Sequence, residues 1–423
     1  MKATYRTFSS QTLDGNTFHQ VVLMVCQVLI VLTGTGFLSI VLWQNSLANK
    51  IEILSLAPML AITCLYYRHL LRGAVASPEI VLIVILAAAS VTWSTYPAES
   101  LERSIPLIVT TAFGLALGSM MSLRGLLLFI ATFFGLSMVL AMGAIIAFPQ
   151  ARGIPPWGDT WNGIYMHKNG LGAAATAALL SCTYAVKTLT GKLKTLFVLL
   201  TLLSLFLLIA SESRTSQILA VVTMSALFLR GLFPNREIMW AICFILISLF
   251  LVGVTAFVLT SPVAEPLFAL IGRKPTLSDR IPLWEAVWPY AMDRFWLGYG
   301  YVAHWYEDAP HLRIYFIKLV FQPFYSHNGL IETFLNVGFV GVVLFFLALM
   351  RFFYAIFYSL WFIQNRDSIA FTLVLGMMFV FGNITESFIL ERLSATWMFF
   401  VAYATKMNLI VKTVRTGQAS AQQ

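Results

Sequence analysis

Apolar runs of roughly 20 residues recur along the whole chain, and a helix of that length can cross the hydrocarbon core of a lipid bilayer. Of the 423 residues, 59% are hydrophobic and 11% are charged, whereas soluble domains carry about a quarter charged residues. The composition therefore excludes an ordinary soluble domain. The pattern predicts an all-α, polytopic integral membrane protein with about twelve transmembrane helices, over residues 21–43, 50–67, 79–94, 104–121, 125–148, 169–186, 195–211, 215–233, 238–260, 329–350, 368–385 and 393–411.

The positions of the charged residues predict how the chain is oriented. If the N-terminus is cytoplasmic, the inner loops and helix ends hold 15 of the 27 Lys and Arg residues but only four of the 18 Asp and Glu residues. Basic residues concentrate on the cytoplasmic side of membrane proteins, so both termini are predicted to be cytoplasmic. The net charge of +9 is thus mostly a matter of topology, and no basic run or aromatic–basic patch indicates nucleic acid.

Several function classes lack their sequence signals. The four cysteines each fall inside an apolar run, which gives neither a disulfide framework nor a clustered metal site. The sequence has no His/Asp/Glu cluster at metal-ligand spacing, no glycine-rich nucleotide loop and no nucleophile elbow. Residues 1–20 form too long a polar segment, without a small-residue cleavage site, for a cleaved signal peptide. We therefore expect no metal, no cofactor and a first helix that stays in place.

One long segment after the N-terminus, residues 261–328, is not mostly apolar and collects many ionisable groups. It predicts a periplasmic loop between transmembrane helices 9 and 10. The chain then divides into residues 1–260 with helices 1–9, the loop itself, and residues 329–423 with helices 10–12 and a cytoplasmic tail. Within the loop, Thr276 and Asp279 resemble a capping box. The apolar face that follows, with two tryptophans beside it, predicts a helix along the membrane interface: Leu283, Val287, Tyr290 and Ala291, with Trp284 and Trp288.

The short turn "SESRTS" at residues 211–216 places Arg214 among small hydroxyl residues at the predicted outer edge of the membrane. The arginine fork suits phosphate oxygens, and the hydroxyls and helix N-terminus beside it also favour anions. The alternative is an arginine that reaches the lipid headgroups or pairs with Glu212. The sequence leaves both interpretations open.

Further basic residues on the same predicted side are candidates for binding an anion. Lys168 and His167 stand at the start of the sixth predicted helix, where free backbone N–H groups favour anions; an ordinary helix cap is the alternative. Arg280 would lie in the first turn of the loop helix, a site that is unfavourable for a cation unless a carboxylate or phosphate compensates. Its alternatives are a pair with Asp279 or a lipid headgroup. Arg273 faces either a phosphate or a headgroup.

His327 ends the loop, directly before the tenth predicted helix. A histidine at the boundary between water and membrane can take a proton from a hydroxyl near neutral pH, and Asn328 and Glu332 could orient it. A structural, helix-capping histidine is the alternative. Glu386 and Glu391 lie on the same predicted side, in "NITESFILER", where a salt bridge explains them as well as a site does.

Five short motifs together resemble the O-antigen ligase and polymerase superfamily, in particular its exopolysaccharide polymerases. They stand in the order of that superfamily, each at a predicted outer edge, and cover roughly the second half of the chain. The motifs are "HKNGLGAAA" at 167–175, "SESRTSQ" at 211–217, "GRKPTLSDRIPLW" at 272–284, "WLGYGY" at 296–301 and "SHNGLIETFLNVGFVG" at 326–341. One departure is Lys274, where relatives often carry an acidic residue, so the role of this position stays open.

This resemblance implies an inverting, metal-independent glycosyltransferase of the bacterial inner membrane, which takes a glycan from an undecaprenyl-diphosphate carrier on the periplasmic side. It implies that Arg214 and Arg280 hold and neutralise the carrier diphosphate. It further implies that His327 is the base acting on the acceptor hydroxyl and that Lys168 is an accessory phosphate or sugar contact. Such groups suffice in principle, because the enzyme must stabilise the leaving diphosphate and activate one hydroxyl. The implied partners are the lipid-linked oligosaccharide, a glycan acceptor, the lipid bilayer, a flippase and a chain-length regulator.

The leading interpretation is a polymerase that joins lipid-linked repeat units into an exopolysaccharide or O-antigen chain. A ligase that moves finished glycan to a lipid A core or a protein is nearly as compatible with the motifs. A transporter or flippase for the same lipid-linked sugar is the alternative from another class. Transporters usually carry ionisable residues near mid-membrane and broken helices, whereas the interiors of the predicted spans hold almost no charge and many ionisable groups of this chain crowd the outer face.

Overall fold

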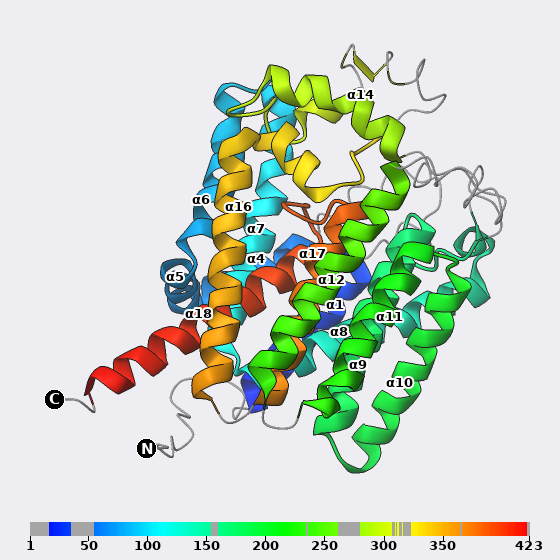
Figure 1. Ribbon diagram of the computed structural model, residues 1–423, viewed down its shortest axis with the longest axis vertical. Helices are drawn as coiled ribbons and strands as arrows, with labels where there is room; N and C mark the ends of the chain where they lie inside the picture. Colours follow the sequence, from blue (N-terminus) through cyan, green and yellow to red (C-terminus); the bar gives the residue numbers. More distant parts are fainter. Residues whose placement is uncertain are drawn as a thin grey trace. The chain divides into compact units, whose positions relative to one another are not determined.

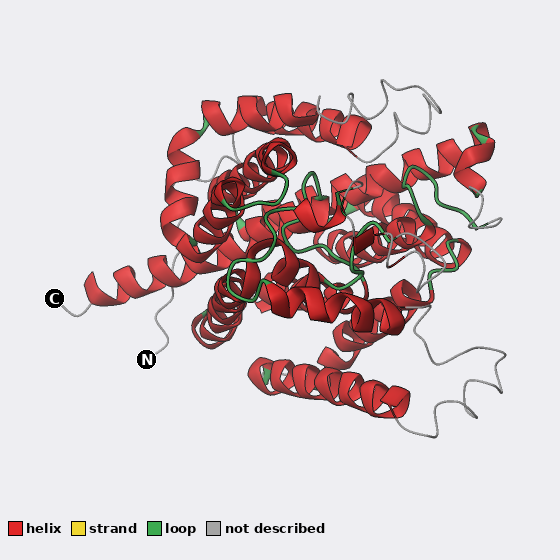
Figure 2. Cartoon of the chain, turned by 90° about the horizontal axis from the view of Figure 1, so that it is seen from above, coloured by secondary structure: helices red, strands yellow, loops and turns green. Residues whose placement is uncertain are grey.

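The computed structural model describes residues 17–34, 55–153, 160–233, 236–260, 280–306, 309, 311, 312, 315, 323–363 and 366–420. Within these residues the secondary structure is helical and contains no strand (Figure 2). The prediction of an all-α protein is therefore confirmed for the described part of the chain.

The helices follow the predicted apolar runs, and each of those runs overlaps a helix (Figure 1). One short helix, α5, was not predicted, because its sequence "YRHLLRGAVA" contains two arginines and is not a continuous apolar run. The α-helices are α1 (Thr17–Gly34), α4 (Leu56–Leu65), α5 (Tyr67–Ala76), α6 (Pro78–Ala89), α7 (Pro97–Met120), α8 (Leu123–Ala147), α9 (Lys168–Thr188), α10 (Gly191–Ala210), α11 (Arg214–Leu229), α12 (Glu237–Thr260), α14 (Arg280–Asp293), α16 (Gly329–Phe362), α17 (Arg366–Thr385) and α18 (Ala395–Ser420). The short 3-10 helices are η3 (Ser90–Thr92), η4 (Pro149–Arg152), η5 (Arg230–Leu232) and η6 (Ala303–Trp305).

Seven helices within the described residues are long and apolar enough to cross a membrane. An eighth span results if α5 and the segment Pro78–Thr92, which meet at a bend of 101°, count as one. Helices α9 and α18 are long enough, but both interrupt their apolar residues with polar ones. The structure thus shows a polytopic helical membrane protein, while the count of twelve spans and the periplasmic side of the loop stay predictions.

The chain forms two compact units, and helices α7 and α18 contribute to both. Unit 1 comprises Met1–Ser77, Thr111–Ser211 and Met398–Gln423, and unit 2 comprises Pro78–Thr110 and Glu212–Trp397.

Small residues allow the helices of unit 1 to pack closely. Helix α9 runs along both α8 and α10, and its Gly- and Ala-rich sequence places little side-chain volume between the backbones. The same holds where α7 meets α18, because a Cβ on Gly118 would lie 2.2 Å from the carbonyl oxygen of Ala402. Small residues thus permit close packing in both places.

Helix α16 is central to unit 2 and packs against α6, α12, α14 and α17. It is broken at Gly338, whose φ of +66° and ψ of −166° are not helical. The chain segment after α14 passes this break, and Tyr299 N donates to Leu335 O at 2.8 Å. A Cβ on Gly338 would lie 2.3 Å from the carbonyl oxygen of Trp296. Glycine is therefore required both for the backbone angle and for the close approach.

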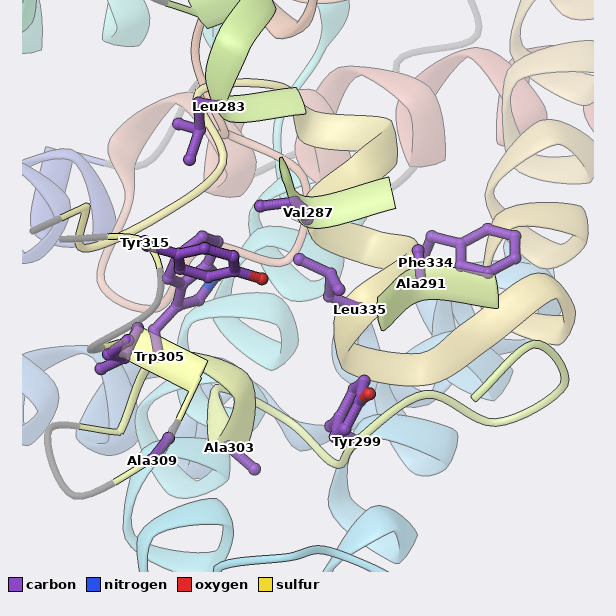
Figure 3. Packing of buried hydrophobic residues seen from close by; sticks show 11 residues of the cluster. Leu283, Val287, Ala291, Tyr299, Ala303, Trp305, Ala309, Tyr315, Phe334 and Leu335 are labelled. Carbon is purple, nitrogen blue, oxygen red and sulfur yellow. The ribbon is translucent and has the colours of Figure 1, made fainter. Parts of the chain in front are cut away.

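The described part of the predicted loop has a hydrophobic core of its own (Figure 3). Leu283, Val287 and Ala291, from the predicted apolar face of α14, are all buried in it. They pack with residues from the following segment and from α16: Tyr299, Ala303, Trp305, Ala309, Leu312, Tyr315, Phe334 and Leu335. By contrast, Trp288 is 51% exposed. Helix α14 is thereby anchored on the start of α16, which fixes the position of its first residue, Arg280.

Candidate functional site

Three ionisable side chains from distant parts of the chain meet in unit 2. Arg280 Nη2 lies 2.6 Å from Glu386 Oε1, and His327 Nδ1 lies 3.5 Å from Glu386 Oε2. The two oxygens of one carboxylate thus face a guanidinium and an imidazole. We refer to Arg280, His327 and Glu386 as the Arg–Glu–His cluster.

Arg280 is the first residue of α14 and is 8% exposed. A cation at a helix N-terminus opposes the helix dipole, so this position predicted a carboxylate or phosphate that compensates for the charge. In the structure this carboxylate is Glu386, which is 106 residues further along the chain. Removing either partner of such a buried pair would leave an uncompensated charge. The pair therefore ties the start of α14 to the turn after α17.

Glu386 lies in the turn after α17, which is organised by Asn383. Asn383 Oδ1 accepts from Phe388 N at 2.8 Å and from Ile389 N at 3.1 Å. The start of α16 lies directly against this turn, because a Cβ on Gly329 would be 2.1 Å from Asn383 Oδ1. The glycine of the "SHNG" motif thus lets the segments that carry His327 and Glu386 approach each other.

His327 has a φ of +52°, a left-handed conformation that costs free energy for a residue other than glycine. Hydrogen bonds on both sides hold the backbone there. Trp284 Nε1 donates to Ser326 O at 2.9 Å, and Asn328 Nδ2 donates to Ile384 O at 3.2 Å. The surrounding structure therefore holds the chain on both sides of His327 in place.

The buried carboxylate of Glu332 holds the same segment through the residue before the histidine, Ser326. It accepts from Trp305 Nε1 at 2.9 and 3.1 Å and from Ser326 N at 2.9 Å. From the sequence, Glu332 was a residue that could orient His327, but the carboxylate facing the imidazole is that of Glu386. Helical spacing did not apply to this pair, because His327 precedes the first residue of α16.

The imidazole of His327 turns one nitrogen inward. Its Nδ1 is buried, whereas the side chain as a whole is 27% exposed, so the exposed surface lies elsewhere on the ring. At 3.5 Å, the contact of Nδ1 with Glu386 is longer than a typical hydrogen bond and is mainly electrostatic. A carboxylate facing Nδ1 favours the tautomer protonated there, which leaves Nε2 as the proton acceptor.

Tyr325 packs beside the imidazole, with the ring centroids of Tyr325 and His327 4.1 Å apart and the rings tilted by 44°. Burial raises the pKa of Tyr325, and the carboxylates of Glu386 and Glu391 raise it further, against the opposing effect of Arg280. The phenol therefore stays protonated at physiological pH and can donate a hydrogen bond next to the cluster.

Arg214 is the first residue of α11, also in unit 2. Ser213 Oγ and Ser216 Oγ are hydrogen-bonded at 2.9 Å and tighten the turn. The guanidinium is exposed and donates through Nη1 to Gln217 Oε1 at 3.1 Å. Arg214 and Glu212 form no ion pair with each other, so the alternative of a local salt bridge is not realised. The rest of the fork is open to solvent or to an anion.

His167 and Lys168 belong to unit 1, where His167 caps α9 by accepting from Asn169 N through Nδ1 at 3.2 Å. His167 thus forms the helix cap that was the alternative to an anion-binding role. Lys168 is the first residue of that helix. Arg273 lies outside the described residues. Of the predicted site residues, the structure joins Arg280 and His327, and within the described residues it gives neither of them a hydrogen bond or ion pair with Arg214.

Glu386 is the residue of the Arg–Glu–His cluster to which the sequence alone assigned no definite role. One signal pointed toward it: an arginine at a helix N-terminus needs an anionic partner, and "NITESFILER" is a polar segment on the same predicted side. Nothing in the sequence, however, pairs that segment with α14 rather than with any other outer loop.

The cluster places a guanidinium, a group suited to anions, beside an imidazole, a group that can accept a proton. Residues 199–346 match the family model described as O-antigen ligase, and this confirms the resemblance to the O-antigen ligase and polymerase superfamily. Members of the family are glycosyltransferase-like enzymes that act on lipid-linked glycans. The matched segment includes Arg214, Arg280 and His327 and ends before Glu386. Among curated proteins, none matches the chain.

Proposed function

We propose that this protein is an inner-membrane polysaccharide polymerase. It would be an inverting, metal-independent glycosyltransferase that moves glycan from an undecaprenyl-diphosphate carrier to a growing exopolysaccharide or O-antigen chain on the periplasmic side. The family match supports an enzyme that acts on lipid-linked glycans. The observation that carries the proposal is the position of Glu386 between Arg280 and His327, which unites a cation for phosphate with a proton acceptor.

In the proposed reaction, His327 Nε2 accepts the proton of the acceptor hydroxyl. The hydroxyl oxygen forms a bond to the anomeric carbon from the side opposite the diphosphate. The bond between that carbon and the diphosphate oxygen breaks, so the configuration at the carbon is inverted. Undecaprenyl diphosphate leaves with the electron pair, and the proton on His327 passes to solvent. The donor is already activated, so the residues need only stabilise the leaving group and the proton transfer.

Glu386 has two functions in this scheme. Its Oε2 stabilises the imidazolium that forms on His327, as the carboxylate does in a catalytic triad. Its Oε1 holds Arg280 at 2.6 Å until the carrier diphosphate binds. The guanidinium fork has enough donors to contact Glu386 and a phosphate oxygen together.

The remaining predicted residues are assigned to the lipid-linked substrate. Arg214 supplies a second guanidinium for the diphosphate, and its exposed fork supports this role. Lys168, His167 and Arg273 are assigned to phosphate or sugar contacts. A flippase that delivers the substrate and a chain-length regulator are the partners that the superfamily resemblance suggests.

A ligase is the second candidate, because the family model that matches is described as O-antigen ligase. It would use the same cluster and the same carrier, with a lipid A core or a protein as the acceptor. The two candidates therefore differ in the acceptor and share their chemistry.

The proposal is tested by the carrier-linked glycans of cells that lack this protein and are complemented with wild type, His327→Ala or Arg280→Ala. For a polymerase, carriers with a single repeat unit accumulate, and polymer returns only with wild type. Removing Arg280 should lower the rate by about 10²–10³-fold, the usual cost of losing one electrostatic donor. Arg294→Ala is the matched control, because Arg294 is exposed in the same loop and pairs with Asp293 at 3.8 Å.

Other outcomes identify the rival functions. Long polymer that remains on the carrier indicates a ligase. Single repeat units confined to the cytoplasmic leaflet indicate a flippase. Wild-type polymer with His327→Ala would show that the catalytic assignment is wrong.

A further inference from the structure

An open recess of about 580 Å³ lies in unit 2, between the beginning of α12, the end of α16 and the beginning of α17. Figure 1 shows these helix ends near the bottom of the view, while α14 lies over the other end of α16. The recess is lined by Arg236, Glu237, Ile238, Met239, Ile242, Leu360, Trp361 and Arg366.

The charges around the recess leave an excess of positive charge. Arg230 holds both nearby carboxylates: it lies 2.7 Å from Glu237 Oε2 and 2.5 Å from Asp367 Oδ1. Arg236 and Arg366 form no ion pair with any residue that the structure describes, and Arg366 Nε makes a long hydrogen bond of 3.4 Å to a backbone carbonyl. With Arg230, Arg236 and Arg366 against Glu237 and Asp367, one positive charge around the recess is not balanced by a carboxylate, and neither Arg236 nor Arg366 is engaged in an ion pair with a described residue.

The rest of the wall is apolar and faces outward. Met239, Ile242 and Trp361 are 40%, 44% and 69% exposed. In membrane proteins, an exposed tryptophan beside arginines is typical of the zone where acyl chains meet headgroups. A ligand that fits this wall therefore has an anionic head and a hydrocarbon tail.

We infer that the recess binds an anionic diacyl phospholipid of the surrounding membrane. Arg236 and Arg366 hold the phosphate, for which arginine forks are well suited. One acyl chain lies along Ile238 and Ile242 of α12, and Trp361 covers the glycerol region. Basic pockets between transmembrane helices bind anionic lipids in this way.

This lipid site is separate from the Arg–Glu–His cluster. His327 directly precedes α16, whereas Leu360 and Trp361 are among the last residues of that 34-residue helix. At 1.5 Å per residue the two sites are separated by roughly 45 Å of helix. The inference therefore does not depend on the proposed polymerase activity, and its readouts do not use that activity.

The test uses the full chain, purified in detergent, with phosphatidylglycerol as the probe and phosphatidylcholine and glycerol 3-phosphate as comparisons. Lipid binding is followed by native mass spectrometry and by the shift of the thermal unfolding midpoint. We expect phosphatidylglycerol to bind and stabilise, and the double variant Arg236→Gln/Arg366→Gln to bind it about tenfold more weakly, as loss of charge-assisted contacts implies. Arg294→Gln, an exposed arginine at the other end of unit 2, should bind like wild type.

Three outcomes would overturn the inference: equal retention of phosphatidylcholine, equal stabilisation by glycerol 3-phosphate, or undiminished phosphatidylglycerol binding by the double variant. A second readout covers the case in which the double variant does not fold. Phosphatidylglycerol brominated on its acyl chains should quench wild type more than Trp361→Phe. Identical quenching of the two would place the lipid elsewhere.

Discussion

Glu386 faces a permanent cation on one oxygen and a titratable ring on the other. With Arg280 at 2.6 Å and a neutral His327, the three groups carry no net charge. When His327 takes a proton, a second cation forms 3.5 Å from the same carboxylate. The excess positive charge is what a bound diphosphate would neutralise. In the proposed reaction, Glu386 would thus couple proton transfer to diphosphate binding.

Glu386→Gln keeps the size of the side chain and removes its charge. We expect the polymerisation rate to fall by about 10²-fold or more, since the corresponding change of a triad carboxylate to an amide costs about 10⁴-fold. The rate is measured in membranes with a lipid-linked donor across a range of pH. The dependence of the rate on pH should change as well, because the carboxylate no longer stabilises the imidazolium that forms on His327.

The control for this variant is Glu285→Gln, which removes an exposed carboxylate from α14. It should leave both the rate and the pH profile unchanged. If Glu386→Gln kept the wild-type pH profile, Glu386 would be no more than a structural partner of Arg280.

At the scale of elements, the loop contacts the helices of unit 2 at the break in α16. The segment after α14 passes the break and is hydrogen-bonded to it through Tyr299 N and Leu335 O. The same helix begins with the Asn328 cap, directly after His327. The position of the histidine therefore depends on a helix that is held at both its start and its break.

Gly338→Ala should destabilise this arrangement. Alanine is strained at a φ of +66°, and its Cβ would lie 2.3 Å from the Trp296 carbonyl. We expect a loss of roughly 1–3 kcal/mol or more in unfolding free energy, seen as a lower thermal midpoint and faster proteolysis of the loop. Gly143→Ala on α8 is the control, since a Cβ there has nothing within 4 Å. Equal midpoints for the two variants would contradict the prediction.

The loop core makes a second prediction at this scale, about pH. His304 is fully buried and faces His311, Tyr290, Tyr299 and Tyr315. The pKa of His304 is lowered from 6.5 to about 2, mainly because the ring is buried and, to a smaller extent, because His311 lies beside it. The unfolded loop binds a proton below about pH 6.5 that the folded loop excludes. The stability of the core is therefore complete above that pH and is lost progressively as the pH falls.

Limited proteolysis of the loop should accordingly accelerate from neutral pH to about pH 5. His304→Phe keeps an aromatic ring and removes the titrating group, so the acceleration should shrink. His167→Asn, in unit 1, should retain it. An unchanged pH dependence in His304→Phe would assign the effect to another group.

At the scale of the whole molecule, periodicity and run length predicted what depends on local sequence. The twelve apolar runs each overlap a helix, and Leu283, Val287 and Ala291 form the buried face expected of α14. The sequence could not predict that Glu386 would pair with a residue 106 positions away, because packing of the helices decides which loops meet. The break at Gly338 was also hidden, since glycine inside an apolar run is compatible with an unbroken helix.

The orientation of the chain is the prediction that belongs to the whole molecule. Positive residues concentrate on the predicted inner side, so the loop around Arg294 should face the periplasm and the turn around Lys192 the cytoplasm. Both residues are exposed in the structure. In a chain whose four cysteines are replaced by alanine, Arg294→Cys should react with a membrane-impermeant maleimide in cells with a permeable outer membrane. Lys192→Cys should react only after the inner membrane is opened. The reverse pattern would put the Arg–Glu–His cluster on the cytoplasmic side, where the proposed periplasmic polymerisation could not take place.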